Sequence, residues 1–370
     1  MPKAQETILE IDLKALKHNF EYLKSKLEPN TNFLAVVKAF AYGNDADEIA
    51  KYLQDLNIDY FAVAYANEGV ALRNAGVTKP ILVLHTLAVN FDVILEHCLE
   101  PNLYNAKILK EFIAFAEGKN QKHYPIHLKF NTGLNRLGFL KDDVDDLVAM
   151  LNNTNAIKAK SLFSHLAASE DLNERDFTLE QIHTFKTLAN NFSKAIGYKP
   201  MLHVSNTSGV LNYPEAHFNM VRCGVGLYGF GNSKKESANL KPIARLKTVI
   251  SQIHHIEKGE SVGYNRAFKS EGSVTKTATL PLGHADGIGR IYGNGKGFVT
   301  VNGKKAPIIG NVCMDMIMIN ITNIDCKEGD EVVIFDDKTT SAETLAEHAG
   351  TISYELITSI SQRVKRVIMK

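Results

Sequence analysis

The chain reads Asn32-Phe33-Leu34-Ala35-Val36-Val37-Lys38 just after a segment whose apolar residues recur every three or four positions, from Leu13 to Leu27. A short apolar run of this kind is typical of a buried strand. The spacing before it predicts an amphipathic helix with Asp12 as its N-cap. The first unit of the fold is therefore expected to be a helix followed by a strand that ends in a lysine.

The same alternation of apolar runs and helical patterns continues to about residue 235. We expect strands in the segments 33–38, 60–64, 81–84, 102–104, 126–130, 157–164, 202–204 and 220–223. Helical spacing is found in the segments 48–54, 89–98, 106–117, 144–151 and 179–192. Eight strands that alternate with helices predict a TIM-type (β/α)₈ barrel within the α/β class, ahead of an open doubly wound sheet.

The pattern changes near residue 240 to β-branched runs broken by Gly and Asn. Such runs occupy residues 248–250, 297–301, 307–309 and 331–335. They predict a second, mainly β domain. We place the barrel domain at residues 1–235 and the C-terminal mainly β domain at 236–370, with the first few residues free to join the β domain. The boundary depends only on the change in composition between Gly231 and Lys241.

Composition favours a small-molecule ligand. The 370 residues contain 42 Lys and Arg against 41 Asp and Glu, a net charge of +1 that gives no reason to expect a nucleic acid or membrane partner. The four cysteines are widely spaced and are expected to be reduced thiols. The sequence shows neither a signal peptide nor an apolar run long enough to span a membrane, so we expect a cytoplasmic protein.

Ionisable and polar residues collect at the ends of the predicted strands, where barrels of this kind carry their active sites. The residues concerned are Lys38, Lys129, His165, Asn206, Thr207 and Arg222. A lysine enclosed at a strand end would lose proton affinity and could attack an aldehyde cofactor. A strand-end lysine that simply extends into solvent is the alternative, and Lys38 taken alone favours that alternative.

Three further features fit a phosphorylated, planar ligand. The segments Ser205–Gly209 and Gly224–Gly226 follow the last two strands, and loops at these places often bind phosphate in barrels, although ordinary turns are the alternative. Arg222 lies in an apolar setting and needs a partner, for which a pyridine nitrogen is a candidate. His165 could contact a planar cofactor, although a strand-end histidine is more often structural.

Several segments of the chain together resemble the alanine racemases, which are barrel-type (fold type III) enzymes that use pyridoxal 5′-phosphate (PLP). The resemblance covers nearly the whole chain. It is carried by Val36–Gly43, Leu128-Lys129, Thr132-Gly133, Arg136–Gly138, Arg222–Gly229, Val262–Arg266, Ala285–Gly287, Cys313–Asp315 and Ile352–Glu355. It implies an amino-acid racemase that interconverts L-alanine and D-alanine and supplies D-alanine for peptidoglycan.

The resemblance also implies roles for individual residues. Lys38 would bind the cofactor covalently, and Lys38 and Tyr264 would transfer protons on opposite faces of the substrate. Arg222 would bond the pyridine nitrogen of PLP and keep it unprotonated. The phosphate would be held by Tyr42, Asn206, Thr207, Gly224 and Tyr354. Substrate binding would involve Arg136, which also lies near the phenolic oxygen of the cofactor, and Met314. No metal is expected.

Members of this family are head-to-tail homodimers, so the resemblance implies that Tyr264 and Met314 serve the barrel of the other subunit. Lys129 matches a position that some members carbamylate. Three residues depart from the usual pattern: His284 replaces a tyrosine, Asn131 an aspartate and Phe40 an asparagine. We expect these departures to affect substrate range and turnover rather than the type of reaction.

Three other functions are compatible with parts of the sequence. A PLP-dependent decarboxylase or broad-specificity racemase would share the barrel, but the segment around Tyr264 argues against decarboxylation. A non-catalytic PLP carrier would not need the second domain. A metal-dependent barrel hydrolase would need His and carboxylate ligands at several strand ends, and only His165 fits.

Overall fold

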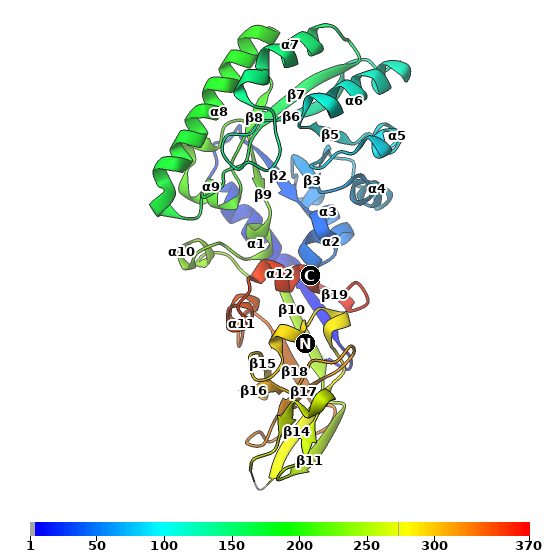
Figure 1. The fold of residues 1–370 in the computed structure, drawn as a ribbon, viewed down its shortest axis with the longest axis vertical. Coiled ribbons are helices and arrows are strands. Elements are labelled where there is room, and N and C mark those ends of the chain that lie inside the picture. Colours follow the sequence, from blue (N-terminus) through cyan, green and yellow to red (C-terminus); the bar gives the residue numbers. More distant parts are fainter. Residues whose placement is uncertain (1–3, 273) are drawn as a thin grey trace.

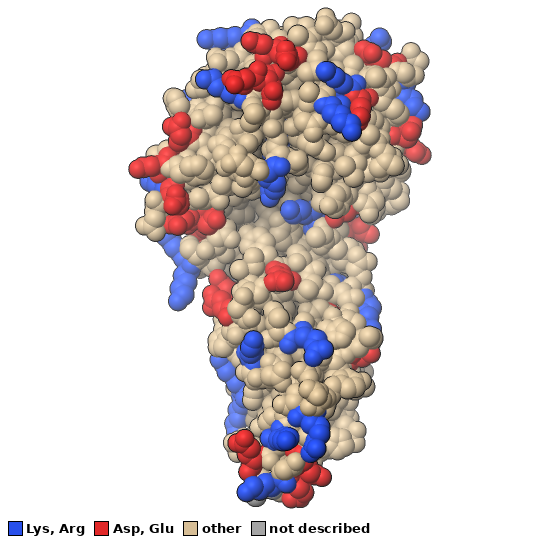
Figure 2. All heavy atoms as spheres, in the orientation of Figure 1, with Lys and Arg blue, Asp and Glu red and all other residues tan. Residues whose placement is uncertain are grey.

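The computed structural model describes residues 4–272 and 274–370. These residues form a wide barrel and a narrower, elongated β domain that extends from its lower end (Figure 1). None of the helices in the described ranges has both the length and the hydrophobicity of a membrane span. Groups of acidic and of basic side chains are scattered over the visible face, which is hollowed where the barrel meets the β domain (Figure 2).

Eight parallel strands in the order β8-β7-β6-β5-β4-β3-β2-β9 form the barrel. Their bounds are β2 Asn32–Val36, β3 Tyr60–Val63, β4 Ile81–Val83, β5 Glu100–Leu103, β6 Tyr124–Lys129, β7 Ile157–Phe163, β8 Met201–His203 and β9 Met220–Cys223. Two backbone hydrogen bonds cross the seam between β8 and β9, from Asn219 N to Leu202 O (3.1 Å) and from Arg222 N to Ser205 O (3.0 Å). The predicted (β/α)₈ barrel is therefore confirmed.

Helices surround the strands. They are α1 Leu13–Lys24, α2 Lys38–Gly43, α3 Ala46–Asp55, α4 Ala66–Asn74, α5 Phe91–Glu96, α6 Ala106–Gly118, α7 Val144–Asn152, α8 Arg175–Ile196 and α9 Thr207–Asn212, with short 3₁₀ turns at Ala88–Asn90, Lys141–Asp143, Leu172–Glu174, Pro214–Ala216 and Val225–Tyr228. Asp12 caps α1 as predicted, because its carboxylate accepts hydrogen bonds from the N–H groups of Lys14 and Ala15. Leu16, Phe20 and Leu23 bury the apolar face of this helix.

Several predicted strand boundaries were wrong by one or two residues. The first strand was expected to reach Lys38, but β2 ends at Val36 and Lys38 begins the turn of α2. The strand expected at 102–104 begins earlier, at Glu100. Glu100 and Pro101 are poor strand formers, and the parallel ladder with β4 nevertheless includes Pro101, opposite Val83.

The second domain is built on a nine-stranded sheet in the order β11-β14-β17-β16-β15-β18-β10-β1-β19. Its strands are β1 Ile8–Asp12, β10 Ala244–Val249, β11 Gln252–Glu257, β14 Val274–Leu280, β15 Phe298–Val301, β16 Lys304–Ile309, β17 Ile317–Asn320, β18 Glu331–Phe335 and β19 Lys365–Met369. The pair β12 Ser261–Val262 and β13 Phe268–Lys269, the helices α10 Lys234–Ser237, α11 Ala342–Ala349 and α12 Ser353–Ser359, and 3₁₀ turns at Tyr264–Arg266, His284–Asp286 and Arg290–Tyr292 complete this part of the chain.

The start of the chain pairs with this second sheet. Strand β1 is antiparallel to β10 and parallel to β19. The described N-terminal residues thus contribute a strand to the β domain before α1 enters the barrel. The division at residue 235 remains a prediction.

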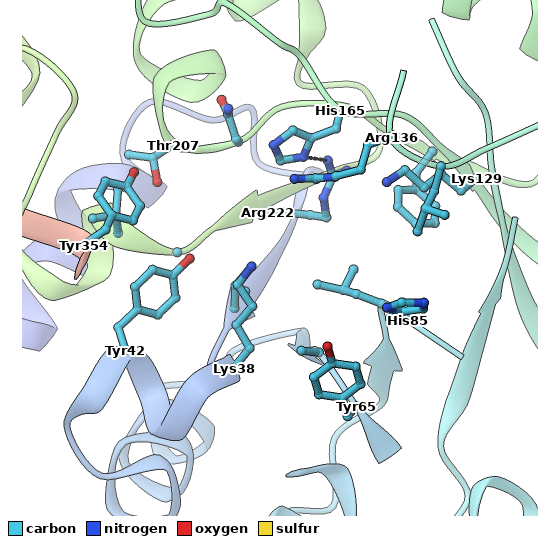
Figure 3. Close-up of a pocket in the computed structure, with 18 of the residues that line it drawn as sticks. Lys38, Tyr42, Tyr65, His85, Lys129, Arg136, His165, Thr207, Arg222 and Tyr354 are labelled. Carbon is cyan, nitrogen blue, oxygen red and sulfur yellow. Dashed lines mark hydrogen bonds between the residues drawn. The ribbon is translucent and has the colours of Figure 1, made fainter. Parts of the chain in front are cut away.

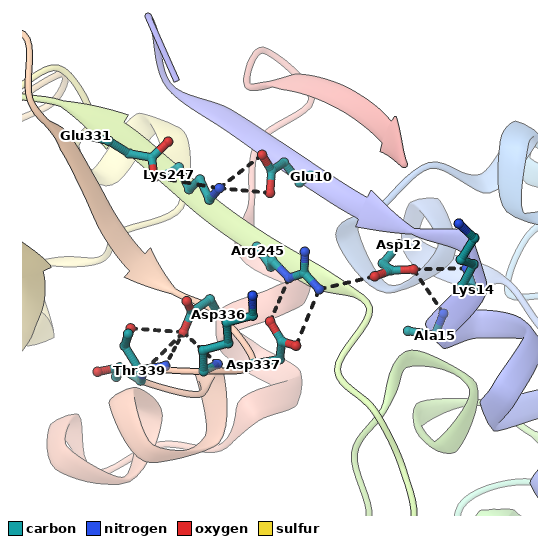
Figure 4. A network of polar contacts seen from close by, with 12 residues as sticks. Glu10, Asp12, Lys14, Ala15, Arg245, Lys247, Glu331, Asp336, Asp337 and Thr339 are labelled. Atoms are coloured by element: carbon teal, nitrogen blue, oxygen red, sulfur yellow. Dashed lines mark hydrogen bonds and ion pairs between the residues drawn. The ribbon is translucent and has the colours of Figure 1, made fainter. Parts of the chain in front are cut away.

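A network of ion pairs connects the two parts (Figure 4). Arg245 of β10 contacts the carboxylate of Asp12, the N-cap of α1, at 3.1 Å and that of Asp337 at 2.7 Å. Lys247 contacts Glu10 at 3.1 Å. Since the side chains of Arg245 and Lys247 are only 12% and 11% exposed, these pairs are poorly screened by solvent and help fix β1 and α1 against the β domain.

Candidate active site

A cavity of about 620 Å³ lies at the carboxyl-terminal ends of the barrel strands (Figure 3). Ten of the twelve predicted site residues line it: Lys38, Tyr42, Lys129, Arg136, His165, Asn206, Thr207, Arg222, Gly224 and Tyr354. They come from the barrel strands, from the loops and helices α2 and α9 that follow them and, for Tyr354, from helix α12. The structure therefore brings residues separated by more than three hundred positions into one site.

Lys38 is held by an unusual backbone turn. The four residues after it, Ala39 to Tyr42, all have φ between 51° and 55°, so this stretch of α2 is a left-handed turn. Each such non-glycine residue costs about 1–2 kcal/mol relative to the right-handed form. Gly43 follows with φ 81° and packs so closely on helix α12 that a Cβ atom there would overlap the Ile357 carbonyl oxygen. Strain next to Lys38 is thus retained by the surrounding structure.

The carboxylate of Glu68 fixes the start of this turn. Oε1 of Glu68, on α4, accepts a hydrogen bond from the Ala39 N–H at 2.6 Å. Oε2 accepts from the N–H groups of Ala64 and Tyr65 at 2.7 and 3.1 Å. Burial and the Arg136 charge lower the pKa of Lys38, while Glu68 opposes them. A lysine with a lowered pKa more readily provides the neutral amine that forms a bond to an aldehyde.

Arg222 is fixed at the base of the cavity. Its Nη1 atom donates to Nδ1 and the carbonyl oxygen of His203, at 2.8 and 3.0 Å. Its Nη2 atom donates to the carbonyl oxygens of Ser164 and Val204 and lies 3.2 Å from Nδ1 of His165. Within the described residues, the guanidinium donates hydrogen bonds only from its two terminal nitrogens. The Nε–H group is left as the donor for a ligand.

The histidine beside Arg222 is uncharged. Burial, together with the charges of Arg222, Arg136, Lys129 and Lys38, lowers the pKa of His165 well below its ordinary value. A neutral ring at this place can accept a hydrogen bond from Arg222 and leaves the guanidinium as the cation.

Tyr42 and Tyr354 bring two phenols to the opposite side of the cavity. The Tyr42 ring stacks on Tyr228 with centroids 4.6 Å apart. Its hydroxyl lies against Gly224, where a Cβ atom would overlap it. The Tyr354 hydroxyl donates to Oδ1 of Asn232 at 3.0 Å. Burial raises the pKa of both phenols, so they remain protonated donors.

Asn206 and Thr207 lie at the start of α9, just after β8. Oδ1 of Asn206 accepts from the Gly209 N–H at 2.8 Å and caps the helix. The Thr207 hydroxyl accepts from the Gly226 N–H at 3.3 Å and so connects the two loops that were expected to bind phosphate.

The cavity wall carries four cationic side chains, and among the described residues that line it there is no aspartate or glutamate. The cations are Lys38, Lys129, Arg136 and Arg222. Burial and the charges of Arg136, Arg222 and Lys38 lower the pKa of Lys129 to about 8. Together with the phenol and hydroxyl donors, this charge suits an anionic ligand such as a phosphate ester.

Tyr264 and Met314 lie elsewhere in the chain. Both line a separate, more open hollow of about 410 Å³ in the β domain, with Cys313 and Met318. Tyr264 is 73% exposed and Met314 is 59% exposed. Neither side chain is part of the Lys38 cavity within one copy of the chain.

Sequence reasoning missed three polar residues of the cavity, Tyr65, His85 and Asn232. Tyr65 and His85 lie two residues after the ends of β3 and β4, so the rule applied to the other strand ends could have found them. Asn232 lies between the barrel and the β domain and had no such signal. Its backbone N–H donates to the buried carboxylate of Glu236, which places its side chain opposite Tyr354.

Comparison with known proteins agrees with this geometry. The profile of the alanine racemase N-terminal domain matches residues 11–231, and that of the alanine racemase C-terminal domain matches residues 243–368. The chain belongs to the alanine racemase family. An alanine racemase of Clostridium novyi is 36% identical to it, over 98% of this chain and 95% of the relative.

Solved alanine racemase structures match over the full length. One from Clostridium difficile 630, in complex with cycloserine, has a TM-score of 0.90 at 32% identity and covers 100% of this chain and 96% of its own. One from Bartonella henselae, with covalently bound pyridoxal phosphate, has a TM-score of 0.89 at 28% identity and covers 99% of this chain and 100% of its own. The protein is thus an amino-acid racemase of a PLP-dependent family that binds small molecules.

Proposed function

We propose that this alanine racemase moves the α-proton of alanine between Lys38 on one face and Tyr264 of a second copy on the other. The observation that carries the proposal is the position of Lys38 in a cation-lined cavity, while Tyr264 is exposed on the β domain, where another copy of the chain can reach it. Two proton carriers on opposite faces are what racemisation requires.

The residues that line the cavity suit PLP, and each part of the cofactor has a candidate partner among them. Lys38 provides the amine for a covalent bond. The phosphate would be bound by Tyr42, Asn206, Thr207, Tyr354 and the backbone at Gly224, and Arg222 would donate its Nε–H to the ring nitrogen. When bound, PLP supplies an electron-withdrawing ring that weakens the Cα–H bond of the amino acid.

The residues around the reacting atoms would control where protons go. Because a guanidinium does not readily release a proton, Arg222 would keep the ring nitrogen unprotonated. Nζ of Lys38 would remove or return the proton on its face, and Oη of Tyr264 would do so on the other. Arg136 would bind the substrate carboxylate, with Met314 beside it, and His165 would remain a neutral neighbour of Arg222.

Tyr264 and Met314 can serve this cavity only from a partner subunit, so we propose a head-to-tail homodimer. Lys38→Ala and Tyr264→Phe variants should each be inactive alone. When they are mixed and reassembled, about half of the dimers should be hybrids with one intact site, which gives about a quarter of the normal activity. A mixture without activity would contradict the shared site.

Lys129 is the proposed carbamylation site. Uncarbamylated, its ammonium group would face Lys38, Arg136 and Arg222, which all disfavour the charge. A carbamate would turn this repulsion into an attraction and fix Arg136. We further propose a cytoplasmic enzyme that supplies D-alanine for peptidoglycan.

Chiral chromatography tests the reaction itself. L-alanine, L-serine and L-lysine are incubated separately with purified protein and PLP, and Lys38→Ala serves as the blank. Equal amounts of D- and L-alanine at equilibrium, absent from the blank, are expected. Bound PLP without any D-enantiomer would argue against racemisation.

A further inference from the structure

A line of buried polar side chains runs through the barrel from the cavity to the opposite side of its interior. Nη1 of Arg222 lies 2.8 Å from Nδ1 of His203, and Nε2 of His203 lies 2.8 Å from Oγ of Ser161. Oγ of Ser161 lies 2.5 Å from Nδ1 of His127, whose Nε2 lies 2.7 Å from Oε2 of Glu100. The five residues come from β9, β8, β7, β6 and β5, which follow one another around the barrel.

The contacts allow one order of protons. A guanidinium is only a donor, so Nδ1 of His203 must be the acceptor and the proton of this ring must be on Nε2. Nε2–H of His203 then donates to Ser161, the Ser161 hydroxyl donates to Nδ1 of His127, and Nε2–H of His127 donates to the Glu100 carboxylate. Every donor has one acceptor, and the bonds all point from the Arg222 cation to the Glu100 anion.

Other assignments leave a buried group unmatched. If both nitrogens of His127 carried protons, Ser161 would receive two donors and its own hydroxyl would lack an acceptor. His127, Ser161 and His203 are fully buried, so water cannot replace a lost partner. The proton order therefore follows from the packing of the barrel.

The charges at the two ends agree with this order. Burial alone would raise the pKa of Glu100, but its contacts with His127 and Lys160 lower it, so the carboxylate is ionised. Lys160 lies 2.7 Å from Oε1, and Tyr60 donates to Oε2 at 3.3 Å. Burial and the Arg222 cation lower the pKa of His203 well below its ordinary value, so this ring is neutral.

We propose that Glu100, His127 and Ser161 are positioning residues that hold His203 in its neutral, Nε2-protonated form, so that its Nδ1 lone pair anchors the Arg222 guanidinium. The proposal rests on the role of Arg222 in the proposed function. None of the three residues reaches the cavity wall. They act on the reaction through His203, by keeping Arg222 oriented and its Nε–H available to the cofactor.

The first test needs no variant. In holoenzyme labelled with ¹⁵N-histidine, the ring nitrogens of His127 and His203 should both show protonated Nε2 and unprotonated Nδ1 throughout the neutral pH range. His127→Gln and His203→Gln variants assign the signals. A protonated Nδ1 on either ring would overturn the proposal.

The second test breaks the line at its centre. Ser161→Ala should alter the His203 ring signals, shift the absorption of bound PLP and lower kcat about 10- to 100-fold, the range seen when partners that orient active-site ligands are removed, with little change in KM. Ser161→Thr keeps the hydroxyl, so the ring signals, the PLP absorption and kcat should all stay close to those of the unsubstituted enzyme. Tyr60→Phe removes a contact with the same carboxylate outside the line and should change none of them.

Unchanged ring signals and kcat in Ser161→Ala would overturn the proposal. Failure of the proposed function has a different signature. In that case Arg222→Lys would leave the absorption of bound PLP and turnover unaltered, while the histidine signals of the unsubstituted holoenzyme would still show the proton order given above.

Discussion

The Glu68 carboxylate fixes the backbone immediately after the active-site lysine, because its Oε1 atom lies 2.6 Å from the Ala39 nitrogen. Its other oxygen accepts from the backbone at the end of β3. One side chain therefore joins the β3 strand end to the turn that carries Lys38. It also adds a negative charge that opposes the lowering of the Lys38 pKa by burial and Arg136.

Glu68→Gln tests both effects. The amide would turn one acceptor oxygen into a donor that faces backbone N–H groups, and the loss of charge would lower the Lys38 pKa further. We expect the pH midpoint of covalent PLP uptake, followed by absorbance, to move to lower pH, and kcat to fall about 10-fold. Glu111→Gln is the control, because this half-exposed carboxylate of α6 pairs with Lys107. An unmoved midpoint would show that Glu68 does not influence Lys38.

The left-handed turn predicts a stabilising substitution in an unusual place. Ala39 is exposed and has φ 52°, so Ala39→Gly removes conformational strain without opening a cavity. We expect the free energy of unfolding to rise by about 1 kcal/mol in denaturant titrations. Ala114 is equally exposed but lies within the right-handed helix α6, and Ala114→Gly should lower this free energy by about 1 kcal/mol. Changes of the same sign would contradict this account of the turn.

Gly224 predicts a specific defect in cofactor binding. A methyl group there would overlap the Tyr42 hydroxyl, so Gly224→Ala should displace a phenol that we assign to the phosphate. We expect the Kd for PLP, measured by fluorescence titration, to rise at least about 10-fold, equivalent to one lost hydrogen bond to a charged group. Gly118 has no atom within 4 Å of the corresponding position, so Gly118→Ala should leave the Kd unchanged. Equal affinities would remove Tyr42 from the phosphate site.

The fold was predictable because most barrel strands are short apolar runs and most of the longer helices around them have apolar residues at helical spacing. The exceptions have local causes. Glu100 and Pro101 concealed the start of β5, and the end of β2 was misplaced because Val37 and Lys38 continue an apolar run while the backbone already turns. Apolar character reports burial, and at this point burial continues after the strand has ended.

The cavity was predictable where a residue lies at the end of a strand or just after it, as for Lys129, His165 and Arg222. Glu68 and Asn232 could not be found in this way. The Ala39 N–H that bonds to Glu68 and the Tyr354 hydroxyl that bonds to Asn232 are brought near them only by folding. The proton order from Arg222 to Glu100 was equally hidden. It depends on side chains from five neighbouring strands that point into the same interior, and strand spacing alone does not show which polar atoms meet.

Lys129 gives a prediction whose direction follows from its pKa. Burial and the charges of Arg136, Arg222 and Lys38 lower this pKa to about 8. At pH 7 about a tenth of the side chain would then be neutral, against less than about a thousandth for an ordinary lysine. Only the neutral amine adds to carbon dioxide, and it loses a proton as the N–C bond of the carbamate forms.

We therefore expect the carbamylated fraction to rise with pH through about 8 at a fixed concentration of dissolved carbon dioxide, since the neutral amine increases over that interval. Native mass measurement without acid would show one added carbon dioxide per chain. Lys129→Met should show none, because it keeps the length of the side chain but lacks the amine. A mass that does not change at any pH would mean that the cation cluster is relieved by a bound anion instead, since four unscreened cations around one cavity require a compensating charge.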